Sequence, residues 1–371
     1  MSELYIGLMS GTSLDGVDAV LANFSDSRPV VLGHCSAPLP PDLKSELLAL
    51  NSPTDNELHR AALAANGLAR VYSQVVQTLL QQCGVAASAV RAIGAHGQTV
   101  RHRPQEFDGT GYTLQLNQPA LLAELCGIDV VAEFRSRDVA AGGQGAPLVP
   151  PFHHAFFGQP EQRLAVLNIG GISNITVLDP FAAHPITGFD CGPGNALMDA
   201  WCLEHTGAPF DEGGGWAAQG TVSAELLYRL QDEPFFAKAP PKSTGRDLFN
   251  TPWLRPKLVG LEALQPQDVQ AALTELTAQA CANSLLLATK GCETLIVCGG
   301  GAFNLHLMDR LQSALPACQV VSSAKFGLPP LQVEATAFAW LARQTMERLP
   351  ANVPSVTGAR GARILGAIYP A

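Results

Sequence analysis

Runs of apolar residues alternate with helical patterns along the first part of the chain. Three strand-like runs come first, and stretches with helical spacing of apolar residues and good helix formers follow them. The predicted strands are 4–9, 18–24, 30–39, 90–95, 112–116 and 129–134, and the predicted helices are 42–50, 56–82 and 119–126. This mixture predicts an α/β fold in which mixed sheets are flanked by helices.

The rest of the chain repeats this order. The predicted strands are 164–168, 173–178, 186–191, 294–298 and 319–322, and the predicted helices are 195–205, 223–231, 268–290, 303–315 and 333–348. Two units of three strands, helix, strand, helix and strand indicate an internal duplication with a ligand cleft between two lobes. We predict the lobes at residues 1–130 and 131–349, with the tail 350–371 as a candidate addition to the first.

Length and composition agree with two packed lobes. The chain has 371 residues, and a domain commonly has about 100–200. Hydrophobic residues make up 47% and charged residues 15% of the chain, which favours a folded core over disorder. A formal net charge of −9 provides no global attraction for nucleic acid or an anionic membrane. We therefore expect a small-molecule ligand held by local donors.

The cysteines and the N-terminus indicate a cytoplasmic protein. The nine cysteines form no CxxC pair, so we interpret them as reduced thiols and not as a disulfide framework or a zinc site. The first residues lack the basic region of a secretory signal. No run of about 18 apolar residues, the length of a membrane span, occurs without polar interruption.

A glycine-rich turn between the first two predicted strands offers the first candidate chemistry. It consists of Gly11, Thr12, Ser13, Leu14, Asp15, Gly16, Val17 and Asp18. Its exposed N–H groups can form a concavity that binds an anion such as a phosphate. Asp15 and Asp18 could hold Mg²⁺ through water, because this ion keeps much of its hydration shell. A tight turn capped by its own side chains is the alternative interpretation.

Two more glycine loops lie at corresponding places in the second unit. Gly170 and Gly171 follow its first strand, and Gly299, Gly300, Gly301 and Asn304 lie where a later strand ends and a helix begins. A helix N-terminus suits a phosphate, and bare glycine backbone lets an adenine or ribose come close. The Walker signature and the dinucleotide fingerprint G-x-G-x-x-G are both absent from the sequence.

The glycine hairpins of the two units resemble the phosphate loops of the acetate and sugar kinase, actin and chaperone-ATPase superfamily. Within it, the whole chain resembles the anhydro-N-acetylmuramic acid kinases. The resemblance rests on GLMSGTSLDG at 7–16, GAHGQT at 94–99, FRSRDVAAGGQGAPLVP at 134–150, LNIGGISN at 167–174, GFDCGPGN at 188–195, KSTGR at 242–246 and VCGGGAFN at 297–304.

This resemblance implies a duplicated actin-like (RNase H-like) two-lobe fold and an unusual kinase reaction. ATP, with Mg²⁺, would phosphorylate O6 of a 1,6-anhydro sugar while water adds at C1, which gives N-acetylmuramic acid 6-phosphate. The resemblance also implies a homodimer. Two alternatives stay open: a nucleotide-operated switch of the actin type, and a kinase of the same fold for another sugar or a short carboxylic acid.

Asp190 is the candidate general base. It comes at the end of a predicted strand, directly before the turn Cys191-Gly192-Pro193-Gly194, which can fix its carboxylate. An Asp that accepts N–H groups of its own turn is the structural alternative, and the resemblance assigns the catalytic role to Asp190.

Several further residues are candidates for sugar binding. Arg135 or Arg137 could bind the lactyl carboxylate of the sugar, since guanidinium groups form paired bonds with carboxylates, while the other arginine pairs locally, for example with Asp138. The remaining candidates are donors to sugar oxygens, at His96, Gln98 and Thr99, and a basic loop over substrate or phosphates, at Lys242, Thr244 and Arg246. A structural histidine and a plain exposed turn are the respective alternatives.

Overall fold

The computed structural model describes residues 3–11, 14, 16–26, 28–246 and 248–371. The chain divides into two compact units. Unit 1 comprises Met1–Phe156 and Leu331–Ala371, and unit 2 comprises Phe157–Pro330.

Unit 1 is built on a six-stranded mixed sheet with the order β13-β7-β4-β1-β2-β3. β1 pairs with β2, β2 with β3, and β13 with β7 in antiparallel fashion, whereas β1 pairs with β4 and β4 with β7 in parallel. The strands are β1 (Leu4–Met9), β2 (Gly16–Asn23), β3 (Val30–Pro38), β4 (Val90–Ala95), β7 (Val130–Ala132) and β13 (Ala367–Tyr369). A separate antiparallel hairpin is formed by β5 (Gln98–Pro104) and β6 (Gly111–Leu116).

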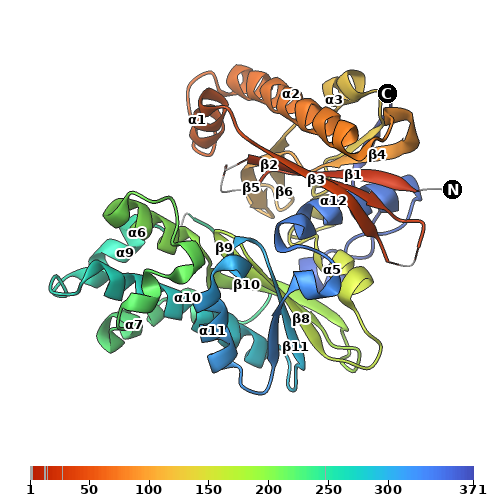
Figure 1. Ribbon diagram of the computed structural model, residues 1–371. Coiled ribbons are helices and arrows are strands. Elements are labelled where there is room, and N and C mark those ends of the chain that lie inside the picture. Colours follow the sequence, from red (N-terminus) through yellow and green to blue (C-terminus); the bar gives the residue numbers. More distant parts are fainter. Residues whose placement is uncertain (1–2, 12–13, 15, 27, 247) are drawn as a thin grey trace. The chain divides into compact units, whose positions relative to one another are not determined.

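Helices lie along this sheet, which Figure 1 shows between α2 and α12. The helices that pack on its strands are α2 (Glu57–Cys83), α3 (Pro119–Cys126) and α12 (Val333–Met346). The other helices of this part of the chain are α1 (Pro41–Ala49), α4 (Ser136–Ala140), α5 (Pro150–Phe157) and α13 (Pro354–Thr357). Leu68, Tyr72, Val75 and Leu79 of α2 recur at helical spacing and are fully or almost fully buried. Burial of each such side chain contributes about 1.5–3 kcal/mol, so α2 is held mainly by its apolar face.

The helix α12 packs very closely on the centre of the same sheet. A Cβ atom at Gly7 would lie 1.8 Å from the carbonyl oxygen of Ala335, and one at Gly94 would lie 2.1 Å from that of Phe338. Only glycine allows this approach. Helix α12 therefore belongs to unit 1, whereas the predicted division at residue 130 places it in the second lobe.

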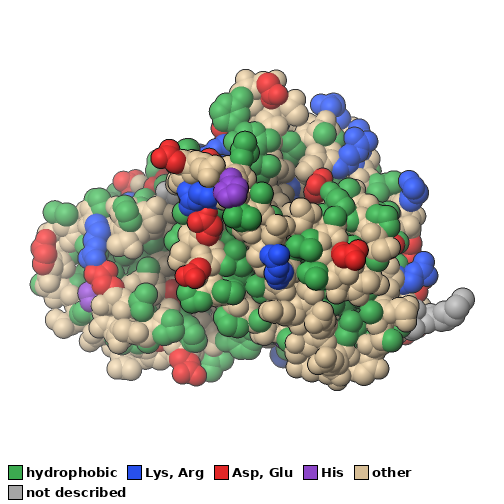
Figure 2. Space-filling model, turned by 90° about the horizontal axis from the view of Figure 1, so that it is seen from above, with side chains coloured by type: hydrophobic (Ala, Val, Ile, Leu, Met, Phe, Trp, Pro, Cys, Tyr) green, Lys and Arg blue, Asp and Glu red, His purple; other side chains and the backbone are tan. Residues whose placement is uncertain are grey.

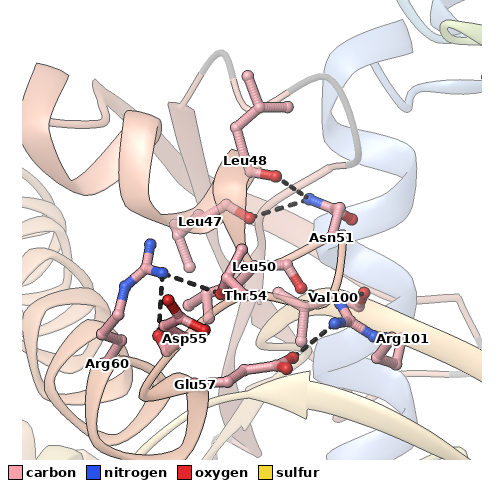
Figure 3. A network of polar contacts seen from close by, with 10 residues as sticks. All are labelled: Leu47, Leu48, Leu50, Asn51, Thr54, Asp55, Glu57, Arg60, Val100 and Arg101. Atoms are coloured by element: carbon pink, nitrogen blue, oxygen red, sulfur yellow. Dashed lines mark hydrogen bonds and ion pairs between the residues drawn. The ribbon is translucent and has the colours of Figure 1, made fainter.

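A polar network joins the linker between α1 and α2 to strand β5 (Figure 3). Arg101 of β5 donates to the carbonyl oxygen of Leu50 and pairs with Glu57 at 2.5 Å. Arg60 of α2 donates to both carboxylate oxygens of Glu46, at 2.7 and 3.0 Å. These contacts satisfy the backbone carbonyl of Leu50 in the linker and the carboxylates of Glu46 in α1 and Glu57 at the start of α2.

Unit 2 repeats the architecture on a five-stranded mixed sheet with the order β10-β9-β8-β11-β12. Its strands are β8 (Leu164–Ile169), β9 (Ile172–Leu178), β10 (Ile186–Pro193), β11 (Thr294–Cys298) and β12 (Gln319–Ser322). Its helices are α6 (Ala196–Thr206), α7 (Ala224–Gln231), α8 (Pro234–Ala237), α9 (Thr251–Leu254), α10 (Pro266–Ala288) and α11 (Leu305–Ala314). The helix α10 packs on β9 and β10, and α11 packs on β12 and α10.

The two sheets share one topology. When the five corresponding strands of each sheet are numbered in chain order, both sheets run 3-2-1-4-5, and β13 extends the first. In both, the first three strands form an antiparallel meander and the fourth pairs with the first in parallel. The predicted α/β class and the predicted duplication with mixed sheets are confirmed.

The surface is consistent with the composition. On the face shown in Figure 2, acidic and basic side chains are interspersed, and neither sign forms a continuous field there. Among the described residues, no helix is both long and apolar enough to cross a membrane.

Candidate functional site

Asp190 lies inside β10 of unit 2, where the pairing with β9 is irregular. The register shifts between Asp190 and Gly192, and the strand continues to Pro193. The prediction that Asp190 ends a strand before a turn is therefore wrong, because a β-bulge takes the place of that turn. Gly192, with φ of 145°, adopts the positive φ that favours glycine.

The neighbouring loop holds both the backbone and the side chain of Asp190. The N–H of Thr244 donates to Oδ2 of Asp190 at 2.9 Å, and the N–H of Asp190 donates to the carbonyl oxygen of Lys242 at 3.1 Å. This fixes the carboxylate, as a general base requires.

Burial sets the proton affinity of this carboxylate. It raises the pKa of Asp190 to about 6, against the opposing effects of the Thr244 N–H and of the positive charge of Lys242. Burial also lowers the pKa of Lys242, whose Nζ donates to the carbonyl oxygen of Phe236 at 3.3 Å and lies 4.8 Å from the ring centroid of Phe235. A carboxylate with a pKa of about 6 is ionised at neutral pH and can still accept a proton effectively.

The structure brings most of the predicted basic loop to Asp190. Lys242 and Thr244 contact it directly, and the exposed Arg246 lies beside the Gly170-Gly171 turn. A Cβ atom at Gly171 would lie 3.0 Å from Nε of Arg246. The hydroxyl of Thr244 is buried and has no hydrogen-bond partner among the described residues.

The glycine loops of unit 2 meet at the end of β8. Gly299 has φ of 78°, and a Cβ atom there would lie 2.4 Å from Oδ1 of Asn168 and 2.7 Å from the carbonyl oxygen of Ile169. Asn195 donates from Nδ2 to Ile169 at 3.1 Å and from its N–H to Gly170 at 2.8 Å. The predicted loops at 170–171 and 299–301 therefore lie together.

Asn304 has a structural role that the sequence analysis did not assign. Its Oδ1 accepts the N–H of Leu307 at 2.9 Å and caps the N-terminus of α11. Sequence reasoning also missed Gly214, where a Cβ atom would lie 2.2 Å from Oδ1 of Asn304, and Asn168, whose buried Oδ1 has no partner within the described part of the chain. The run Gly213-Gly214-Gly215 in the sequence was the signal that could have revealed a further glycine loop in unit 2.

The first glycine turn is described only in part. Thr12, Ser13 and Asp15 lie outside the described residues. The N–H of Leu14 donates to the carbonyl oxygen of Gly11 at 3.1 Å, which closes a turn. Gly16 and Val17 begin β2, and Oδ1 of Asp18 lies 3.2 Å from Nε2 of His34, with both side chains partly exposed.

The hydroxyl of Ser10, directly before this turn, bonds to the loop between β4 and β5. Oγ of Ser10 donates to the carbonyl oxygen of Gly97 at 3.1 Å and lies 2.9 Å from the hydroxyl of Tyr72. Gly97 has φ of 77°, and a Cβ atom there would lie 2.8 Å from the carbonyl oxygen of Leu116. The turn that carries His96 and Gln98 is thus held from two sides.

The buried His96 and the half-buried Arg135 form a pair next to that turn. Nη2 and Nε of Arg135 lie 2.9 and 3.3 Å from Nε2 of His96, and Nη1 donates to the carbonyl oxygen of Gly145 at 2.8 Å. Burial and the positive charge of Arg135 lower the pKa of His96 to about 3, so the imidazole is neutral and accepts from the guanidinium. Burial lowers the pKa of Arg135 to about 10, which leaves it charged.

Asp138 does not pair with Arg135 or Arg137, so the alternative of a local ion pair is wrong. Oδ1 of Asp138 accepts from Asn352 and Thr357, and Oδ2 accepts the N–H of Gly145. Arg137 is exposed on α4. Between the two arginines, Arg135 is the one held among candidate binding residues.

Gln98 and Thr99 begin strand β5 beside His96. Gln98 is buried, and its Oε1 has no hydrogen-bond partner among the described residues. The same holds for Oδ1 of Asn117, which precedes α3. Nε2 of Gln115 donates to the hydroxyl of Thr99 at 3.2 Å. Buried acceptors without partners are costly, so Oε1 of Gln98 and Oδ1 of Asn117 are suited to accept hydrogen bonds from a ligand.

Comparisons with known proteins identify the family of this chain. The family model for anhydro-N-acetylmuramic acid kinase matches residues 3–371. The chain is 64% identical to the anhydro-N-acetylmuramic acid kinase of Albidiferax ferrireducens over 100% of both chains. It is also 64% identical to that of Variovorax paradoxus, over 100% of this chain and 99% of the other.

Solved structures show more distant likeness. An activator of 2-hydroxyisocaproyl-CoA dehydratase from Clostridium difficile with bound ADPNP matches with a TM-score of 0.46 at 12% identity, over 95% of this chain and 99% of that one. A ROK family glucokinase from Streptomyces griseus in complex with glucose and AMPPNP matches with a TM-score of 0.42 at 14% identity, over 92% and 99%. On the full-length sequence matches, the chain belongs to the anhydro-N-acetylmuramic acid kinase family of phosphotransferases.

Proposed function

We propose that this kinase uses ATP to phosphorylate O6 of 1,6-anhydro-N-acetylmuramic acid while water opens the anhydro bridge. The product is N-acetylmuramic acid 6-phosphate, an intermediate of peptidoglycan recycling. The observation that supports the reaction best is the Asp190 carboxylate, which is held by the N–H of Thr244 and has a pKa of about 6.

Asp190 acts as the general base in this proposal. Its carboxylate takes a proton from a water molecule as the water oxygen bonds to C1 of the sugar. The C1–O6 bond breaks, O6 bonds to the γ-phosphorus of ATP, and ADP leaves with the electron pair of the broken P–O bond. The balance is sugar, water and ATP to phosphorylated sugar, ADP and one proton, which Asp190 then releases.

The glycine loops of unit 2 are the proposed nucleotide-binding residues. Gly170, Gly171, Gly299, Gly300, Gly301 and Asn304 belong to this set. A Cβ atom at Gly170 would have only one neighbour within 4 Å, at 3.7 Å, so the backbone there is open to a ligand. The turn from Gly11 to Asp18 in unit 1 is proposed to contact the phosphates.

A role for Mg²⁺ is part of the proposal. Among the described residues, no cluster of three His, Cys, Asp or Glu side chains could hold a metal ion. That is compatible with Mg²⁺, which keeps several waters and takes one or two carboxylates together with substrate phosphates. Asp18, with its partly exposed side chain, and Asp15 are the proposed ligands. The ion would neutralise charge that develops on the phosphates.

Arg135 is the proposed partner of the lactyl carboxylate. A guanidinium has five N–H donors, and three of them point at His96 and Gly145. One N–H on each terminal nitrogen is left for the two oxygens of a carboxylate. His96, Gln98 and Thr99 are proposed to surround the sugar, and Lys242, Thr244 and Arg246 to contact sugar or phosphate. Arg137 is the second choice for the carboxylate.

The product of a single incubation tests the proposal. The protein is incubated with ATP, Mg²⁺ and the anhydro sugar in ¹⁸O-water, and the mass of the product is measured. We expect a phosphorylated sugar with one heavy oxygen at C1. A phosphorylated sugar without the heavy oxygen would refute the hydrolytic half, and absence of any phosphorylated sugar would refute the proposed reaction.

The homodimer implied by the resemblance is proposed with the reaction. Sedimentation of the purified protein measures its mass in solution directly. A single species of twice the chain mass of 39.0 kDa is expected, and a monomer at all accessible concentrations would refute the dimer.

A further inference from the structure

The carboxylate of Asp138 in unit 1 is completely buried and is not used by the reaction described above. It accepts three hydrogen bonds: from the N–H of Gly145 at 2.8 Å, from Nδ2 of Asn352 at 2.6 Å and from the hydroxyl of Thr357 at 2.8 Å. Since an unpartnered buried carboxylate is very unfavourable, these donors fix its position closely.

One of these partners leads directly to the proposed binding residue Arg135. Gly145 donates its N–H to Asp138, and its carbonyl oxygen accepts Nη1 of Arg135 at 2.8 Å. Gly145 has φ of 67° and is followed along the chain by Ala146 and Pro147. Because its backbone conformation is one that most residues avoid, the hydrogen bonds at both of its polar groups determine where its carbonyl points.

The other partners come from the C-terminal segment, more than two hundred residues away in sequence. Besides its hydroxyl bond to Asp138, Thr357 accepts the N–H of Gln144 at 2.7 Å through its carbonyl oxygen. The N–H of Arg360 donates to the carbonyl oxygen of Ala141 at 3.0 Å. The segment 352–360 therefore supports the loop 141–145 on which Arg135 depends.

We propose that Asp138 is a positioning residue for substrate recognition. It orients Gly145, and through that carbonyl it holds the guanidinium of Arg135 between Gly145 and His96 with its free N–H groups toward an anionic sugar. The ligand class is a sugar that carries a carboxylate. This inference rests on the proposed role of Arg135 in binding that carboxylate.

Substitutions at both ends of the chain of contacts test the proposal. In Asp138→Asn the side chain has one acceptor and one donor group, so it cannot accept both from Gly145 and from the C-terminal segment. We expect the Kd of 1,6-anhydro-N-acetylmuramic acid, measured by calorimetry, to rise roughly 5- to 30-fold. The Kd of ATP should not change.

A milder variant guards against loss of folding. Thr357→Val removes one hydrogen bond to Asp138 but keeps the carbonyl oxygen that binds Gln144, and it should raise the Kd of the sugar roughly 2- to 5-fold. Thr357→Ser keeps the hydroxyl and should restore most of the affinity. Thr345→Val is the matched control, because its buried hydroxyl bonds Leu341 and Leu365 and does not touch the loop. It should lower stability with the Kd unchanged.

A double-mutant cycle separates this inference from the proposed function. If Asp138 acts through Arg135, Asp138→Asn should have little further effect on the Kd in the Arg135→Ala background. Equal effects of Asp138→Asn in both backgrounds, or an unchanged Kd in folded Asp138→Asn and Thr357→Val, would overturn the positioning role. An unchanged Kd in Arg135→Ala alone would instead refute the proposed role of Arg135.

Discussion

Replacing Asp190 by Asn should remove activity and raise stability at neutral pH. Burial raises the pKa of Asp190 from 3.8 to about 6 in the folded protein. The folded state therefore binds a proton that the unfolded state has already lost, and this contribution to stability disappears as the pH rises through about 6. Asn carries no charge at any pH and avoids the cost of burying the ionised carboxylate.

The magnitude follows from the two pKa values. At about 1.4 kcal/mol per pH unit, their difference corresponds to at most about 3 kcal/mol at neutral pH and about 1 kcal/mol near pH 4.5. Because Asp190 is partly exposed, solvent reduces these values. We expect the free energy of unfolding of Asp190→Asn to exceed that of the wild type by an amount that grows by roughly 1–2 kcal/mol as the pH rises from about 4.5 to about 7.5.

Urea unfolding measures this difference. Tryptophan fluorescence reports mainly on unit 2, which contains Trp201, Trp216 and Trp253 of the four tryptophans. Asp309→Asn, at an exposed carboxylate of α11, is the matched control and should give a nearly constant difference. Turnover of Asp190→Asn should fall roughly 10²–10⁴-fold. A stability difference that does not change with pH would refute the argument about burial, and normal turnover would refute the role as a base.

Three further outcomes are expected. First, kcat/KM of the wild type should fall roughly tenfold per pH unit below about 6, since only the ionised Asp190 accepts a proton; a flat pH–rate profile down to about pH 5 would contradict this. Second, Gly299→Ala should lower the free energy of unfolding by roughly 1–3 kcal/mol because its Cβ atom would overlap Asn168 and its φ is positive, whereas Gly170→Ala should leave stability nearly unchanged and weaken ATP binding, as calorimetry can determine. Third, Arg135→Ala should weaken sugar binding by roughly 1.5–3 kcal/mol, and an unchanged sugar KM would move the carboxylate to another residue.

The sequence predicted most of the regular elements because their patterns are local. Strand 90–95, helix 119–126 and strands 294–298 and 319–322 agree with β4, α3, β11 and β12 at both ends. The repeated order of elements also predicted the duplication with mixed sheets, and the structure adds the strand order that the two sheets share.

What the sequence did not reveal depends on contacts distant along the chain. Strand β5 was missed because its residues, which include Arg101, His102 and Arg103, are polar and the hairpin forms a separate small sheet. The bulge at Asp190 depends on pairing with β9. The bonds of Asp138 with Asn352 and Thr357 cross 214 and 219 residues, so no local pattern could have distinguished them from an ion pair with a neighbouring arginine.

The two candidate sites contain polar groups that a chain selected for stability alone would satisfy. The buried hydroxyl of Thr244 and the buried oxygens of Gln98 and Asn168 have no hydrogen-bond partner among the described residues, and each such group costs roughly 1–3 kcal/mol. Thr244 adjoins Asp190, Asn168 adjoins Gly299, and Gln98 is near His96. These groups therefore lie beside a carboxylate whose ionised form is unfavourable or beside loops where only glycine fits. The unfavourable terms in the free energy of folding are concentrated at positions where a bound ligand could supply the missing hydrogen bonds. Binding of ATP and sugar should therefore raise the free energy of unfolding by more than contacts with exposed groups alone would, because the ligands would also satisfy these buried groups.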